Sequence, residues 1–312
     1  MREKTGGDWK TRFLAVVKYE LLWNIRKKKF IGVITLAFTL ATLSLVLPVA
    51  LSNMSGGELE ANPEYVISTG AGIGGLGMFL FAVVMVMNSI SGEFESGTIV
   101  PLLTKPVSRT TVFLGKLLAA FITLLSAYAS LFIYMTVGGW IIYGPQNDLY
   151  LLPLSLLGTI ISTLVWMAIV LAIGTISKSS LLAALGTFGI FMALTISSPI
   201  ISFFTNQAWI MHYLPGSGAY GLIQIQTEIQ GVPVIKSISA LTGTDSIAAN
   251  LVNYARYPSA NVTFYSLSSN PLEPITEPLS FILLRSLAVA SAYIIGFLFA
   301  AWYFFKRTQV LE

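Results

Sequence analysis

The side chains that could do chemistry are few in this sequence, and the densest group of them lies in one charged stretch. Residues 91–109 read SGEFESGTIVPLLTKPVSR and separate two long apolar runs. The carboxylates of Glu93 and Glu95 can pair with the guanidinium of Arg109 or with basic residues near the N-terminus. Exposed pairs of this kind contribute about 0–1 kcal/mol each. The pattern therefore indicates positioning of a loop more than catalysis.

Other catalytic patterns are sparse. His212 is the one histidine and cysteine is absent, so neither a histidine-based zinc site nor a thiol nucleophile has its ligands. GAGIGG at residues 70–75 has the letters of a dinucleotide-binding turn, but it leads into an apolar run and lacks the preceding strand. Gly70 and Gly74 instead have the spacing that lets membrane helices approach closely.

One ionisable residue, Arg285, falls inside an apolar run. Its long side chain can reach the membrane interface or pair with Glu277, and the alternative is that it lines a substrate path.

Composition identifies the elements that must position these residues. The chain of 312 residues is 55% hydrophobic and 10% charged, with a mean hydropathy of +0.77, which is typical of a polytopic membrane protein. The apolar runs lack the alternation of a β-barrel, so we predict an all-α fold. Six transmembrane helices are expected at residues 30–52, 69–90, 112–141, 151–177, 181–204 and 279–305.

Basic residues gather on one side of this predicted topology. The N-terminal segment, the 91–111 loop, the 178–180 turn and the C-terminus carry most of the lysines and arginines. The rule that positive loops face the cytoplasm predicts a multi-pass protein of the plasma membrane with both termini cytoplasmic. Asn53 and Asn261 lie in glycosylation sequons on the outer side. The net charge of +4 reflects this topology, so no nucleic-acid partner is expected.

Four parts follow along the chain. Residues 1–29 contain an amphipathic basic helix from residue 9 onwards, which is expected to lie on membrane lipid; a solvated basic tail is the alternative. Residues 30–204 hold helices one to five and the 91–111 loop. Residues 205–278 form a polar extracellular segment, in which TDSIAANLVNYARY predicts a helix capped by Thr244 or Asp245. Residues 279–312 hold helix six and a cytoplasmic tail.

The charged stretch resembles the first cytoplasmic loop of the ABC-2 family of ABC transporter permeases. The elements that carry the resemblance are Glu93 and Glu95, Ser96-Gly97-Thr98, Leu102-Leu103, Pro106-Val107-Ser108-Arg109, and Gly115-Lys116. The basic N-terminal helix is similar to the elbow helix of that family, and six spans with inside termini match its layout. The resemblance implies that the loop docks on a cytoplasmic ABC ATPase and that a second permease chain, identical or different, completes the unit.

The residues of the loop suit docking by a short rigid helix. Pro101 stands near its start and Pro106 stops it, while Ile99, Leu102 and Leu103 offer apolar contacts. The expected ATPase-coupling residues are Glu93, Glu95, Gly97, Thr98, Ile99, Pro101, Leu102, Leu103, Pro106 and Arg109. The chain has no G-x-x-x-x-G-K-[ST] loop, so we expect no cofactor in it, and ATP and magnesium on the partner.

The function predicted is thus the permease subunit of an ATP-driven exporter, itself not an enzyme. A polytopic membrane enzyme acting through residues 205–278, and an ATP-independent receptor or scaffold, are the alternatives. The family commonly has short helices that dip back into the membrane before the last span, and residues 209–225 are expected to form them. The cargo stays open between lipid, peptide, drug and polysaccharide.

Overall fold

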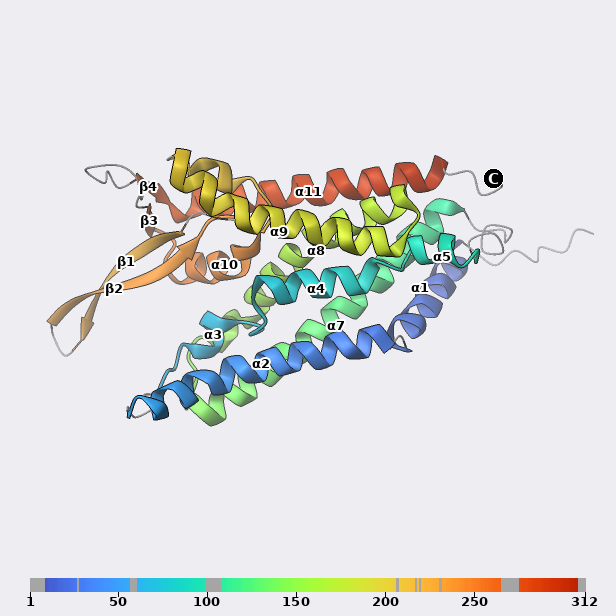
Figure 1. Cartoon of the computed structure of the whole chain (residues 1–312). Coiled ribbons are helices and arrows are strands. Elements are labelled where there is room, and N and C mark those ends of the chain that lie inside the picture. The colour runs from blue at the N-terminus through green and yellow to red at the C-terminus, as the bar shows by residue number, and fades with distance from the viewer. Residues whose placement is uncertain are drawn as a thin grey trace, which may run out of the picture.

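A computed structural model of the chain describes residues 9–26, 28–56, 61–98, 108–205, 208–216, 218, 220–229, 232–264 and 275–307. Long helices run alongside one another and make up most of the molecule (Figure 1). The α-helices are α1 (Trp9–Arg26), α2 (Lys28–Met54), α3 (Tyr65–Thr69), α4 (Gly74–Val86), α5 (Ser91–Glu95), α7 (Arg109–Tyr143), α8 (Leu152–Ser177), α9 (Ser180–Thr205), α10 (Ile247–Arg256) and α11 (Leu279–Arg307). Short 3₁₀ turns are η1 (Leu149–Leu151), η2 (Ala208–His212) and η3 (Thr244–Ser246).

Six helical stretches among the described residues are long and apolar enough to cross a membrane, which confirms the predicted polytopic all-α class. They are Lys28–Met54, Gly74–Glu95, Arg109–Tyr143, Leu149–Ser177, Ser180–Ser198 and Leu279–Arg307. The second begins later than the predicted residue 69, because Gly70 and Gly72 take positive φ angles of 62° and 70° that the interior of a helix does not contain.

Helix α8 is the centre of the bundle. In its apolar stretch of 18 residues, 72% is buried inside the protein; the same share for α9 is 17%. It packs against α4, α9, α10 and α11. Trp166 of α8 is fully buried and meets Phe79 of α4 edge to face at 5.3 Å between ring centroids. The apolar faces of α2, α9 and α11 are largely uncovered and are available to lipid or to another chain.

The connecting segments sort to the two ends of this bundle (Figure 1). Helices α1 and α5 and the C-terminal end of α11 lie at one end, where the Ser179–Ser180 turn also bonds to α5. Helices α3 and α10 and all strands lie at the opposite end. This separation matches the predicted grouping of basic loops; which end faces the cytoplasm stays a prediction.

A four-stranded antiparallel sheet, which we did not predict, lies in the 205–278 segment. Its strands are β1 (Tyr220–Ile229), β2 (Val232–Leu241), β3 (Asn261–Phe264) and β4 (Ile275–Pro278), in the order β2-β1-β3-β4. Ile223, Val262 and Phe264 pack with Leu279 and Ile282 of α11, so the sheet is anchored on the last span.

The prediction that residues 209–225 form helices dipping into the membrane is wrong. The described part of this range contains the short η2 turn and then enters β1, with no longer helix. The alternation of isoleucine and glutamine from Ile223 to Gln226 explains the difference, because a period of two places Ile223 in the core and Gln224 in solvent.

The predicted helix in TDSIAANLVNYARY is confirmed as α10, but its predicted cap is wrong. The residue before the helix is Ser246, and it makes no side-chain capping bond. Thr244 and Asp245 belong to the preceding η3 turn, whose side chains point elsewhere: the Thr244 hydroxyl accepts a hydrogen bond from the Gly216 amide at 3.4 Å. Packing of this turn against α8 has overridden local capping.

Candidate functional site

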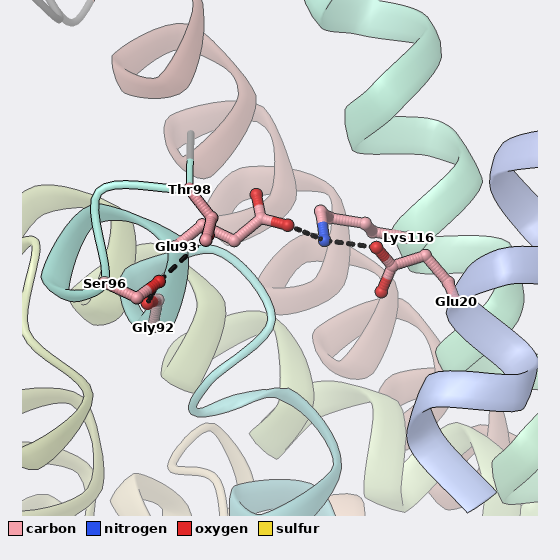
Figure 2. Close-up of polar contacts among 6 residues, drawn as sticks. All are labelled: Glu20, Gly92, Glu93, Ser96, Thr98 and Lys116. Atoms are coloured by element: carbon pink, nitrogen blue, oxygen red, sulfur yellow. Dashed lines mark hydrogen bonds and ion pairs between the residues drawn. The ribbon is translucent and has the colours of Figure 1, made fainter. Parts of the chain in front are cut away.

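The charged stretch begins with a short helix at the end of the bundle that carries α1. Helix α5 presents Glu93 and Glu95 there, and the chain then turns at Gly97, whose φ of +68° favours glycine. The Ser96 hydroxyl lies 2.7 Å from the Gly92 carbonyl and 2.9 Å from the Thr98 hydroxyl (Figure 2). These bonds hold the first part of the predicted coupling loop in a compact turn.

Five of the predicted coupling residues cannot be placed. Ile99, Pro101, Leu102, Leu103 and Pro106 lie outside the described residues, so the predicted short helix stays a prediction. The flanks of the loop, Glu93 to Thr98 and Ser108 onwards, are described.

Glu93 forms a buried ion-pair triad with two other helices. The Lys116 ammonium on α7 lies 2.7 Å from the Glu93 carboxylate and 2.5 Å from the Glu20 carboxylate on α1 (Figure 2). The side chains of Lys116, Glu20 and Glu93 are 4%, 6% and 19% exposed. Burial makes this arrangement far more sensitive to loss of one member than an exposed pair.

Close packing of α1 on α7 permits the triad. A Cβ atom added to Gly115 would lie 2.7 Å from Cγ1 of Val16, so the glycine lets the two helices approach. Glu93 was predicted to pair with Arg109 or with basic residues of the N-terminal helix. The structure places Lys116 of α7 beside it, and the N-terminal helix contributes an acid, Glu20, to the same triad. The sequence singled out Lys116 as part of the Gly115-Lys116 element of the family resemblance, but it did not show which carboxylates Lys116 meets.

Glu95 binds the start of α9. Its carboxylate accepts hydrogen bonds from the Ser180 amide at 2.7 Å, the Ser180 hydroxyl at 2.5 Å and the Ser179 hydroxyl at 3.0 Å. The first amides of a helix have no partner within it and carry the positive end of the helix dipole, so a carboxylate is stabilising there. Glu95 thereby ties α5 to the fifth span.

Arg109, the first residue of α7, binds the end of α11. Its guanidinium donates to the carbonyls of Lys306 at 3.1 Å and Phe305 at 3.5 Å, where the last carbonyls of the helix need donors. Ser108 caps α7 by accepting from the Thr111 amide at 3.1 Å. The flanks of the coupling loop are thus bonded to α1, α7, α9 and α11, an arrangement suited to transmitting force.

Residues at the opposite end are engaged in structural contacts. Arg285 pairs with Glu277 through two hydrogen bonds of 2.8 and 3.2 Å, which is one of the two roles that we predicted for it. A place on a substrate path stays a prediction. Asn53 and Asn261 are exposed, and glycosylation of either is likewise untested.

His212 is buried and bonded through Nδ1 to the Thr242 hydroxyl at 2.5 Å. Burial, with the nearby Arg285 charge, lowers the pKa of His212 to about 4, so its ring is neutral at pH 7. Among the described residues, no group of three His, Cys, Asp or Glu side chains is placed to hold a metal ion.

Sequence reasoning missed the position of Asp245. The η3 turn inserts it beside the fully buried Trp166 of α8, and the Ser162 hydroxyl of α8 donates to the Thr244 carbonyl at 2.6 Å. Burial raises the pKa of Asp245 to about 6. Ser162 gave no clear signal of this contact, because its hydroxyl also bonds to the Gly158 carbonyl of its own helix at 3.0 Å.

A second ionic contact fixes α10 to the loops between spans. The Arg256 guanidinium lies 2.6 Å from the Asp148 carboxylate and 3.7 Å from that of Glu64. The outer segment is therefore joined to the bundle by charge as well as by packing.

Comparison with protein families finds a match to the family described as ABC-2 family transporter protein, over residues 14–310. The matched range includes all six spans, the 91–109 stretch and the outer segment. Comparison with individually curated proteins gives no match.

Proposed function

Because this chain belongs to the ABC-2 family of transporter proteins, we propose that it is the permease subunit of an ATP-driven exporter and that residues 91–109 couple it to a separate cytoplasmic ATPase. The observation that carries the proposal is the set of bonds at the flanks of that stretch. Glu93, Glu95 and Arg109 are each bonded to a different spanning helix, and a displaced loop would pull on all of them.

The proposed coupling works through rigid connections. ATP binding on the partner would displace the 91–109 loop, and the triad would carry that displacement to α1 and α7. Glu95 would carry it to α9, the helix with the most uncovered apolar face. A second permease chain on such a face would complete a path between the two chains, and cargo would leave the side that carries the ATPase. Transitions of this kind occur when packed elements have two discrete arrangements.

The experiment that tests this proposal is affinity purification of the tagged full chain from native membranes, with ATP hydrolysis assayed in the eluate. We expect an ABC ATPase to co-purify and Leu102→Asp to reduce its recovery, because the substitution places a charge on the predicted apolar docking surface. The matched control is Met54→Asp. Met54 is 84% exposed and is the last residue of α2, at the end of the bundle that lies away from α5.

Two results would contradict the proposal. A stable chain that recruits no ATPase would favour a receptor or scaffold, or an enzyme acting through residues 205–278. Equal recovery of the ATPase with Leu102→Asp and Met54→Asp would leave the family membership intact and remove the coupling role of the loop.

A further inference from the structure

A carboxylate that the proposed coupling does not use lies deep in the bundle. The η3 turn places Asp245 beside Trp166, near the middle of α8, and the charge of Asp245 also reaches Tyr128, near the middle of α7. Asp245 therefore lies at the depth of the spans, although its own segment is not a span. Ionisable side chains at this depth are costly, and they mark the paths of substrates and ions.

The charge of Asp245 has no cationic partner within the described part of the chain. Its neighbours are neutral donors: the Trp166 indole, the Gly216 amide, and the Thr244 hydroxyl at 3.4 Å from Oδ1. Burial raises the pKa of Asp245 to about 6, which still leaves most of the carboxyl ionised at pH 7. A charge taken out of water without an opposite charge is unfavourable, so an external cation would be stabilised here.

One side of this carboxylate is left uncovered by glycine. Asp245 is partly exposed, and a Cβ atom added to Gly75 of α4 would lie 3.2 Å from its Oδ2 and near no other atom outside α4. The preceding Gly74 is exposed, and a Cβ atom there would meet nothing within 4 Å. A ligand can therefore approach Oδ2 over the start of α4, where a larger side chain would stand in the way.

The surface beside this approach is aromatic. Gly75 and Phe79 lie one turn apart on the same face of α4. The Phe79 ring lies 4.3 Å from that of Phe191 and 6.2 Å from that of Phe188, both on α9, and Phe188 is 43% exposed. Aromatic rings attract organic cations and also pack against their apolar groups. This cluster favours an organic cation over a small hydrated ion.

From the unpaired carboxylate, the uncovered approach and the aromatic cluster, we propose that Asp245 binds the positive charge of a lipophilic organic cation and that such cations are cargo of the exporter. Phe188 belongs to the uncovered face of α9, so the site borders the proposed path between two permease chains. The assignment as cargo rests on the proposed function, whereas the binding site itself does not.

Equilibrium dialysis of the detergent-purified full chain with radiolabelled tetraphenylphosphonium tests this assignment. Tetraphenylborate, which has the same shape and the opposite charge, is the comparison probe. We expect saturable binding of the phosphonium and none of the borate. Asp245→Asn removes the charge at nearly constant volume and should weaken phosphonium binding about tenfold, the effect of losing one partly buried charge pair. Asp148→Asn is the control, because that carboxylate already pairs with Arg256, and it should leave the affinity unchanged.

A second pair of variants tests the approach to the carboxylate without changing its charge. Gly75→Val places methyl groups beside Oδ2 of Asp245 and should weaken phosphonium binding. Gly296→Val makes the same change at an exposed position of α11 with no atom within 4 Å, and should leave the affinity unchanged. This pair keeps the test informative if Asp245→Asn fails to fold.

Several outcomes would overturn the inference. They are absence of saturable phosphonium binding, equal binding of the borate, and an affinity unchanged by either Asp245→Asn or Gly75→Val. Displacement of the phosphonium by an equal concentration of sodium would overturn the assignment to an organic cation. The assay contains no ATPase, so a negative result leaves the coupling proposal intact, and failure to recover an ATPase leaves the binding result intact.

Discussion

Replacement of Lys116 by methionine is expected to destabilise the protein more than any exposed charge change. Methionine keeps most of the side-chain volume and removes the ammonium that lies 2.5 and 2.7 Å from the two carboxylates. Glu20 and Glu93 would then face each other in a site where the lysine is only 4% exposed. Removal of one member of a buried ionic group costs about 3–5 kcal/mol. A loss of 1 kcal/mol lowers the melting temperature of a chain of moderate size by roughly 2–4 °C. The melting midpoint of the variant should therefore fall by on the order of 10 °C.

The assay is thermal unfolding of the detergent-solubilised full chain followed by intrinsic fluorescence. Lys18→Met is the matched control, since it makes the same chemical change at an exposed position of α1 and should shift the midpoint little. Adding Glu20→Gln and Glu93→Gln to Lys116→Met should recover most of the loss, because the unpaired charges disappear with the cation. Equal midpoints for Lys116→Met and Lys18→Met, or no recovery in the triple variant, would refute the reasoning.

Three further predictions concern other contacts. Glu95→Gln removes the carboxylate from the Ser180 amide, so hydrogen exchange at residues 180–183 should accelerate; unchanged exchange would contradict the capping role. Gly158→Ala should lower the free energy of unfolding of the solubilised chain by about 1–3 kcal/mol, because the added Cβ would lie 2.4 Å from the Ala248 backbone. Gly189→Ala is the control: its Cβ would have no atom within 4 Å, so thermal unfolding should be unchanged. Burial raises the pKa of Asp245 from 3.8 to about 6, so the folded state binds the proton more tightly than the unfolded state does. The free energy of unfolding should therefore fall by roughly 1–3 kcal/mol as the pH rises from 4 to 6. Melting curves recorded across this pH range should show a weaker pH dependence for Asp245→Asn.

Hydropathy predicted the spans well because a bilayer imposes one requirement on every helix that crosses it. The predicted bounds of the third and sixth spans, 112–141 and 279–305, lie within three residues of α7 and α11. The late start of α4 depends on the conformations of Gly70 and Gly72, which composition alone does not reveal.

Contacts between distant residues were the part that the sequence could not supply. Lys116 is 96 residues from Glu20, and its place in the Gly115-Lys116 element does not show which carboxylates it meets. The sheet had a local signal, the isoleucine–glutamine alternation of β1, which we passed over in favour of the helices expected from the family. Asp245 was assigned to a helix cap because local rules do not show when a turn will be drawn into a bundle.

The bond between Ser162 and Thr244 bears on how the protein is made. The two residues are 82 positions apart, and a ribosome adding about 5–20 residues per second needs roughly 4–16 s to bridge them. During that time α8 has been synthesised, while the turn that covers Ser162 and the start of α10 that covers Gly158 do not yet exist. The nascent helix waits in the bilayer with the Ser162 hydroxyl bonded only to the Gly158 carbonyl of its own helix and with the Gly158 backbone uncovered. Substitutions in the outer segment should therefore lower the amount of protein that accumulates in the membrane before they alter its transport.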